Sequence, residues 1–97
     1  HVEQAVECAT KCIELLGDSC PEVRADTLVI LGQAYLLLGQ TGKAIEEVNA
    51  AMELLEQEPT SRMTAESWMN AAAVLESAGD QEGSTFAYQR AMECSGL

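Results

Sequence analysis

The sequence predicts an all-α fold, a superhelix of about five antiparallel helices made of half a repeat and two full repeats. One observation is a period of 40 residues: Ala51-Met52-Glu53 recurs as Ala91-Met92-Glu93, and Leu28 has its counterpart in Trp68. Another is that apolar residues recur at helical spacing along the chain, without sustained strand alternation. Such a period is typical of a solenoid, in which each unit buries its apolar face against its neighbours.

The first two helices are predicted from their apolar spacing and from the residues that end them. Residues 1–16 carry apolar side chains at helical spacing, and Gly17 supplies a C-terminal stop. A second helix is expected over residues 22–38, because Pro21 suits a first helical turn and Gly39 ends the apolar pattern.

The third helix is expected to begin at Thr41, whose hydroxyl can cap the first backbone N–H groups. One face of this helix carries the apolar residues Ala44, Ile45, Val48, Ala51, Met52 and Leu55. The helix should end near Gln57, before Pro59, because proline cannot continue a helix.

The fourth and fifth helices belong to the second copy of the repeat. The 40-residue offset places the start of the fourth helix at Thr60 and Ser61, and Gly79 should end it. Asp80 is a favourable N-cap for the fifth helix, and Glu82 is favourable in its first turn. The short connections make consecutive helices antiparallel neighbours.

The repeat divides the single domain into three parts: residues 1–18 as the second helix of a partial repeat, and residues 21–58 and 60–97 as full repeats. The assignment of the first part comes from Ala5-Val6-Glu7, which aligns with Ala44-Ile45-Glu46 at an offset of 39. The chain therefore opens halfway through a unit, whereas solenoid ends normally carry a polar cap. We expect this chain to be a fragment of a longer protein.

The acidic balance of the chain argues against several classes of partner. It has 16 acidic and 5 basic residues among 97, a formal charge of −11. The basic residues are scattered between Lys11 and Arg90, whereas phosphate contacts need clustered Lys and Arg. We expect no direct nucleic-acid binding by this segment and no membrane association. The charge serves solubility, or it favours basic or neutral partners.

The four cysteines do not indicate a disulfide scaffold. Cys8, Cys12 and Cys94 lie inside helical patterns, and the chain has enough aliphatic residues for a core. Reduced thiols in a cytoplasmic protein are the expectation. Cys12 aligns with Ala51 in the repeat, so we expect it to pack in the core, whereas Cys20 is the thiol that we expect to be exposed.

Nothing in the sequence indicates catalysis, a cofactor or a metal site. The only histidine is His1, and there is no glycine-rich phosphate loop. Cys8 and Cys12 share a helix face, but a metal needs more ligands at fixed spacing. We therefore predict that the chain is not an enzyme. A metal-dependent or thiol enzyme is a hypothesis that bound zinc would revive.

The repeat units resemble tetratricopeptide repeats over essentially the whole chain. The matching positions are Leu28, Leu31-Gly32, Tyr35, Gly39, Ala44, Val48 and Ala51 in the first full unit, and Trp68, Gly79, Tyr88 and Ala91 in the second. Small residues are expected where helices approach closely, at Gly32, Ala44, Ala51, Ala72, Ser84 and Ala91. Leu28, Tyr35, Trp68 and Tyr88 are expected to fill the space between the helices. The period exceeds the usual ~34 residues of this family.

The resemblance implies that the first helix of each unit lines a concave groove. The implied partner-binding residues are Asp26, Val29, Ile30, Gln33, Leu36 and Leu37 from the first unit, with Glu66, Met69, Asn70, Ala73, Glu76 and Ser77 from the second. The groove is expected to be apolar in the first unit and acidic toward the second. Members that clamp acidic chaperone tails place Lys, Asn and Arg in this groove, whereas this chain has Val29, Ile30, Gln33 and Met69 instead.

The predicted function is a protein- or peptide-binding module of a larger cytoplasmic protein, whose partner is an apolar helix or a peptide with a basic end. Alternatively, Val29, Ile30, Leu36 and Leu37 pack on missing N-terminal helices or on the second subunit of a homodimer. The longer period and the closing Gly96-Leu97 also resemble the C-terminal repeats of bacterial helix-turn-helix transcriptional regulators. That resemblance implies a ligand-sensing or dimerisation region, whose DNA-binding domain is absent from this chain.

Overall fold

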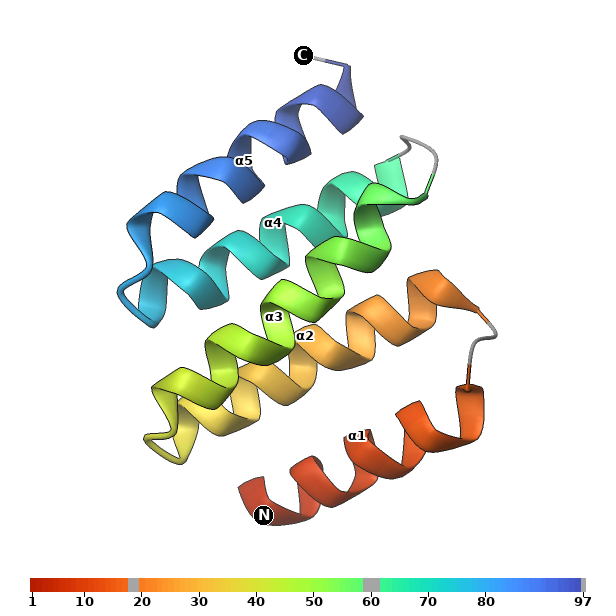
Figure 1. The fold of residues 1–97 in the computed structure, drawn as a ribbon, viewed down its shortest axis with the longest axis vertical. Coiled ribbons are helices and arrows are strands. Elements are labelled where there is room, and N and C mark those ends of the chain that lie inside the picture. The colour runs from red at the N-terminus through yellow and green to blue at the C-terminus, as the bar shows by residue number, and fades with distance from the viewer. Residues whose placement is uncertain (18–19, 59–61, 97) are drawn as a thin grey trace.

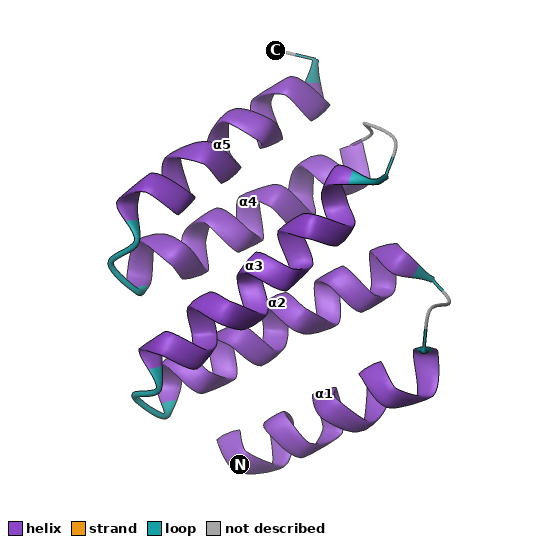
Figure 2. Ribbon diagram, viewed as in Figure 1, coloured by secondary structure: helices purple, strands orange, loops and turns teal. Residues whose placement is uncertain are grey.

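The computed structural model describes residues 1–17, 20–58 and 62–96, which form five α-helices and no strand (Figures 1 and 2). The helices are α1 (Val2–Leu16), α2 (Pro21–Leu37), α3 (Thr41–Glu56), α4 (Arg62–Ser77) and α5 (Gln81–Ser95). The all-α class and the five-helix order are confirmed. Thr60 and Ser61, where the fourth helix was expected to begin, lie outside the described residues.

The helices are stacked side by side into a slab of 37 × 31 × 17 Å. Figure 1 shows α1 at one end and α5 at the other, with neighbouring helices running in opposite directions. Helix α3 contacts both α2 and α4, and α2 also contacts α4 directly. Because α3 reverses the chain between them, α2 and α4 run in the same direction, and their N-terminal ends lie toward the same edge of the slab.

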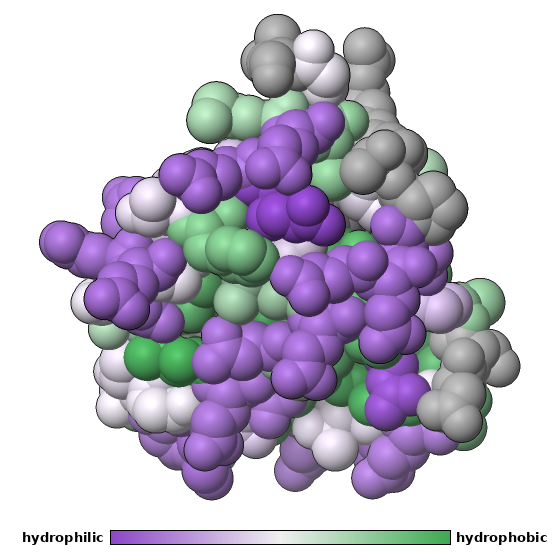
Figure 3. All heavy atoms as spheres, turned by 45° about the horizontal axis from the view of Figure 1, so that its top comes forward, coloured by the Kyte–Doolittle hydropathy of each residue, from purple (hydrophilic) through white to green (hydrophobic). Residues whose placement is uncertain are grey.

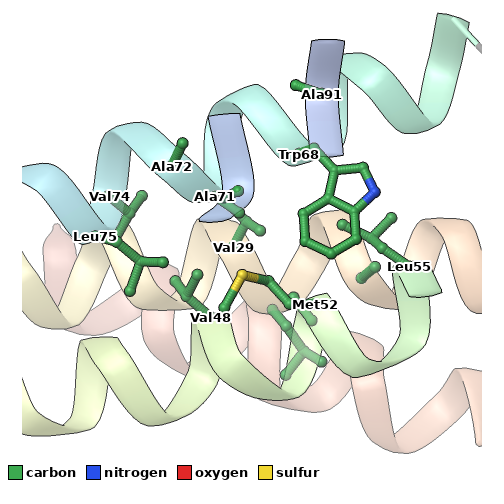
Figure 4. Close-up of a cluster of buried hydrophobic side chains, with 14 residues drawn as sticks. Val29, Val48, Met52, Leu55, Trp68, Ala71, Ala72, Val74, Leu75 and Ala91 are labelled. Carbon is green, nitrogen blue, oxygen red and sulfur yellow. The ribbon is translucent and has the colours of Figure 1, made fainter. Parts of the chain in front are cut away.

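The core lies between α2, α3, α4 and α5, and its largest fully buried side chain is Trp68 (Figure 4). The Phe86 ring and the indole form a T-shaped pair with 5.8 Å between ring centroids, and the Arg90 guanidinium carbon lies 5.5 Å from the indole centroid. Leu55 and Leu75 are also buried to less than 2 % exposure. Trp68 and Leu75 come from α4, which is therefore the central helix of this core.

Small residues permit the close helix contacts that the repeat predicts. Gly32, Ala44, Ala51, Ala72, Ser84 and Ala91 are all buried. A Cβ atom added at Gly32 would lie 2.8 Å from Cγ2 of Val48 and 3.2 Å from the carbonyl oxygen of Ala44. The first full unit thus needs glycine where α2 meets α3.

Two residues expected between the helices are more exposed than predicted. Tyr88 is 36 % exposed, because its hydroxyl turns outward and donates a hydrogen bond of 3.3 Å to the Glu76 carboxylate. Tyr35 is half-buried. Of the four residues in this set, Leu28 and Trp68 are the two that are buried as predicted.

Helix α1 is less buried than its apolar pattern predicts. It packs against α2, and Ala9 is its one buried residue. Cys12 was expected in the core but is half-buried, since α1 packs mainly against a single helix, α2, among the described residues. Cys20 is exposed, as expected, and all four cysteines are free.

Of two predicted N-cap residues, the structure confirms the one of α5 and contradicts the one of α3. The Asp80 carboxylate accepts a hydrogen bond of 3.0 Å from the Gly83 N–H, which confirms Asp80 as the N-cap of α5. The prediction that Thr41 caps α3 is wrong: Gln40 is the N-cap, with φ −96° and ψ 68°, and no side chain makes a capping bond. Thr41 already has a helical backbone and is therefore the first residue of α3 rather than its cap.

Candidate functional site

The candidate site is a groove between α2 and α4, which we call the α2–α4 groove. The positions chosen on α2 recur three, four, seven, ten and eleven residues after Asp26, so they form one stripe along the helix. Since α2 and α4 contact each other and run in the same direction, their stripes form the two walls of one groove. Two adjoining hollows lie along it.

The first hollow, which we call the acidic hollow, has a volume of about 350 Å³. Its lining consists of Glu22, Asp26, Val29, Ile30, Gln33, Met63, Glu66, Ser67 and Asn70. The Ser67 hydroxyl donates a hydrogen bond of 2.5 Å to Oδ1 of Asp26 and so joins α4 to α2 across the hollow. Val29 is 3 % exposed and belongs to the core, so it contributes the floor of the hollow.

The second hollow, which we call the apolar hollow, has a volume of about 320 Å³. It is lined by Gln33, Leu36, Leu37, Ala73, Val74 and Ser77. Gln33 lines both hollows, so they adjoin each other along the groove. The carboxylates of the acidic hollow come from the N-terminal halves of α2 and α4, and the apolar hollow lies closer to the C-terminal ends of these helices.

Ten of the twelve residues that the resemblance places in the groove line these hollows. The acidic hollow includes Asp26, Val29, Ile30, Gln33, Glu66 and Asn70, and the apolar hollow includes Gln33, Leu36, Leu37, Ala73 and Ser77. Met69 and Glu76 are absent from both linings among the described residues. Met69 is 54 % exposed, and the Glu76 carboxylate accepts the hydrogen bond from Tyr88 of α5.

The residue stripe taken from the resemblance missed Glu22, Met63, Ser67 and Val74, which also line the groove. Glu22 lies four residues before Asp26, so extending the stripe on α2 by one helical turn would have found it. Met63 lies four residues before Ser67 on α4. Ser67 and Val74 are buried, and the sequence does not distinguish a buried residue that lines a groove from one that only packs in the core.

The negative charge of the groove varies along the length of α2 and α4. It was expected to vary from one repeat to the next, with an apolar first unit and an acidic second unit. Glu22, Asp26 and Glu66 all lie in the acidic hollow, although they come from different repeats. No basic residue lines either hollow among the side chains that the structure describes. The face in Figure 3 is mostly hydrophilic, with hydrophobic side chains visible between the polar ones.

Two groups outside the hollows have raised pKa values. Desolvation, followed by the charge and the hydrogen bond of Glu76, raises the pKa of Tyr88, because a phenolate would be repelled by the carboxylate. Partial burial, followed by repulsion from Glu46, raises the pKa of Glu47 on α3. Neither group lines the groove.

The side chains of the groove offer binding chemistry. Carboxylates and amides gather at one end and aliphatic side chains dominate the other, while Ser67 is 6 % exposed and its hydroxyl donates to Asp26. Within residues 1–17, 20–58 and 62–96, no three metal-ligating side chains come together. None of the helices described there is long and apolar enough to cross a membrane.

Comparison with known proteins supports the repeat assignment. A family model described as tetratricopeptide repeat matches residues 23–95, which include most of α2 and all of α3, α4 and α5. Searches of curated proteins and of solved structures found no match. The family match spans most of the chain and coincides with the two helix pairs found in the structure. The chain therefore belongs to the tetratricopeptide repeat family.

Proposed function

We propose that the chain is a protein-interaction module that binds a peptide segment of a partner protein in the α2–α4 groove. The observation that carries this proposal is that the acidic and apolar hollows adjoin at Gln33, which lines both. Together they form a concave surface with polar groups at one end and apolar groups at the other. Concave surfaces of this kind suit the recognition of an extended or helical peptide.

Exposed apolar side chains gather along this groove. Ile30 is 53 % exposed, Leu37 76 %, and Met63 66 %. Single exposed apolar residues are ordinary, but a group of them along one concave surface is typical of an interaction site. A partner that covers these side chains removes their apolar surface from water, which favours binding.

The partner that fits this surface is a protein or peptide with apolar residues, a basic residue, or both. Carboxylates at one end attract a cation, and the formal charge of −11 favours the approach of basic segments. The narrower resemblance to bacterial transcriptional regulators gains no support from the family match. That role and a cytoplasmic location stay predictions.

The experiment is a selection of random 12-residue peptides displayed on phage, followed by affinity measurements on synthetic copies of the selected peptides. Leu37→Ser should weaken their binding about 5- to 10-fold, since it removes apolar contact area at an exposed position. Leu15→Ser is the matched control, because Leu15 is 88 % exposed on α1, away from the groove, and it should leave affinity unchanged.

Equal affinities for the Leu37→Ser and Leu15→Ser variants would contradict the proposal. The proposal would also be contradicted if the chain selected no peptide and formed a dimer that the Leu37→Ser substitution dissociates, as measured by sedimentation velocity. In that case the groove would be covered by a second copy of the chain. Circular dichroism of both variants checks that their folds are unchanged.

A further inference from the structure

We propose that the α2–α4 groove recognises an extended segment that carries one Arg or Lys in the acidic hollow and apolar residues in the apolar hollow, about five residues away in one fixed chain direction. This inference rests on the proposed function and specifies its partner. It follows from the placement of charge along the groove, from the length of the groove, and from the polar groups at its centre.

The acidic hollow suits a basic side chain better than any other group. Asp26 and Glu66 face it from different helices, and Glu22 adds a third carboxylate one turn before Asp26. The hydrogen bond from Ser67 holds the Asp26 carboxylate in place, so less side-chain freedom is lost when a cation binds.

The apolar residues of the same hollow suit the stem of that basic side chain. Ile30 and Met63 are both more than half exposed and lie beside the carboxylates. Lys and Arg bury their methylene stems on such surfaces while the charged head remains near its partners. Asp26 is the sixth residue of α2, so the positive end of the helix dipole, which acts within the first turn, opposes a cation only weakly.

The length of the groove sets the spacing within the bound segment. Asp26 and Leu37 are eleven residues apart on α2, about 17 Å at the helical rise of ~1.5 Å per residue. An extended chain covers that distance in about five residues at ~3.3 Å each, whereas a helix would need about eleven. The two modes therefore predict different spacings.

The centre of the groove favours the extended mode. Gln33 and Asn70 lie between the carboxylates and the aliphatic side chains, and both are exposed. Their amides can donate and accept hydrogen bonds. An extended peptide presents unpaired backbone N–H and C=O groups to such amides, whereas a helix already satisfies its own.

The test uses focused phage libraries in which one Arg and a Leu-Leu pair are fixed at spacings of two to eleven residues, in both orders, with random residues elsewhere. Selection on the chain should enrich one order, with spacings near five. Enrichment of both orders alike, of spacings near eleven, or of clones that have lost the Arg would overturn the inference.

Variants of the chain then test the carboxylates with an enriched peptide labelled with fluorescein. The double variant Asp26→Asn with Glu66→Gln should weaken its binding about 10-fold, since an exposed ion pair contributes up to about 5-fold. The double variant Glu46→Gln with Glu53→Gln is the matched control, because it makes the same charge change at exposed positions on α3, outside both hollows. A copy of the peptide with uncharged citrulline in place of Arg should bind the two double variants with equal affinity.

The outcomes separate this inference from the proposed function. If Leu37→Ser weakens binding while the Asp26→Asn, Glu66→Gln variant does not, the groove binds peptides but this inference is wrong. If the control double variant weakens binding equally, net charge rather than the acidic hollow attracts the peptide, and the inference is again wrong. If neither Leu37→Ser nor the carboxylate variants change affinity, the proposed function fails as well.

Discussion

Gly32 lies where α2 and α3 approach each other closely. An added Cβ would lie 2.8 Å from Cγ2 of Val48 and 3.2 Å from the Ala44 carbonyl oxygen. Both distances are short, and the backbone oxygen has little freedom to move. The sequence predicted this contact, because Gly32 occupies the small position of the repeat.

Replacing Gly32 with alanine should therefore destabilise the chain. The helical preference of alanine favours the substitution by about 1 kcal/mol, whereas overpacking costs about 1–3 kcal/mol, so we expect a net loss of about 1 kcal/mol. Gly42→Ala is the matched control, since Gly42 lies in α3 and its added Cβ meets nothing within 4 Å. We expect that variant to gain up to about 1 kcal/mol.

Urea denaturation followed by circular dichroism measures both free energies of unfolding. Gly32→Val should lose more stability than Gly32→Ala, because the larger side chain meets the same two neighbours. Equal gains for the two alanine variants would mean that α2 and α3 have room for a side chain at Gly32.

Some residue-level features could not be predicted from local pattern. Ser67 and Asp26 form a hydrogen bond across 41 residues of sequence, and neither residue is distinctive where it stands. Tyr88 occupies a core position of the repeat, yet its hydroxyl reaches Glu76, which offers a hydrogen-bond acceptor near the surface. Such partners depend on how helices lie beside each other, and one sequence without its relatives does not contain that information.

At the scale of the helices, existence was easier to predict than boundaries. All five helices were expected from apolar spacing, which depends on many residues at once. The position of a cap depends on the backbone angles of one residue, and candidates such as Gln40 and Thr41 are adjacent in the sequence, so apolar spacing does not distinguish them. Asp80 was predicted correctly because Asp is a preferred N-cap residue, whereas Gln40, which follows Gly39 in the same way, is not.

The two capping sites provide a direct test at this scale. Asp80→Ala should lower the free energy of unfolding by about 1 kcal/mol, because the Gly83 N–H loses the carboxylate that accepts its hydrogen bond. Thr41→Ala should change it by less than about 0.5 kcal/mol, since no side chain caps α3. Thermal and urea denaturation of both variants measure the difference. A larger loss for Thr41→Ala would contradict the structural assignment of Gln40 as the N-cap.

At the scale of the molecule, the sequence predicted where the groove lies but not how its charge is arranged. The stripe of α2 follows from the resemblance to tetratricopeptide repeats, and all six of its residues line the hollows. The gathering of Glu22, Asp26 and Glu66 in one hollow depends on the lateral alignment of α2 and α4. The repeat suggested a division between units, whereas packing brings the N-terminal halves of both helices together.

The whole chain carries 16 acidic and 5 basic residues, so like charges repel across the folded molecule. The screening length falls from about 30 Å at 0.01 M salt to about 8 Å at 0.15 M. The longer value matches the 37 × 31 × 17 Å extent of the slab, so at low salt carboxylates across the entire molecule repel one another. Unfolding separates them, and low salt should therefore destabilise the fold.

We expect the melting temperature to rise between 10 mM and 150 mM NaCl by several degrees, since about 1 kcal/mol corresponds to about 4–8 °C in a domain of this size. Scanning calorimetry in NaCl and in choline chloride measures the rise and separates screening from binding of a specific cation. A variant with Glu46, Glu53 and Glu56 replaced by Gln, all exposed on α3, should show a smaller rise, because fewer charges remain to be screened. A melting temperature that is independent of salt would show that the acidic surface does not strain the fold, and would leave partner attraction as the main physical consequence of the charge.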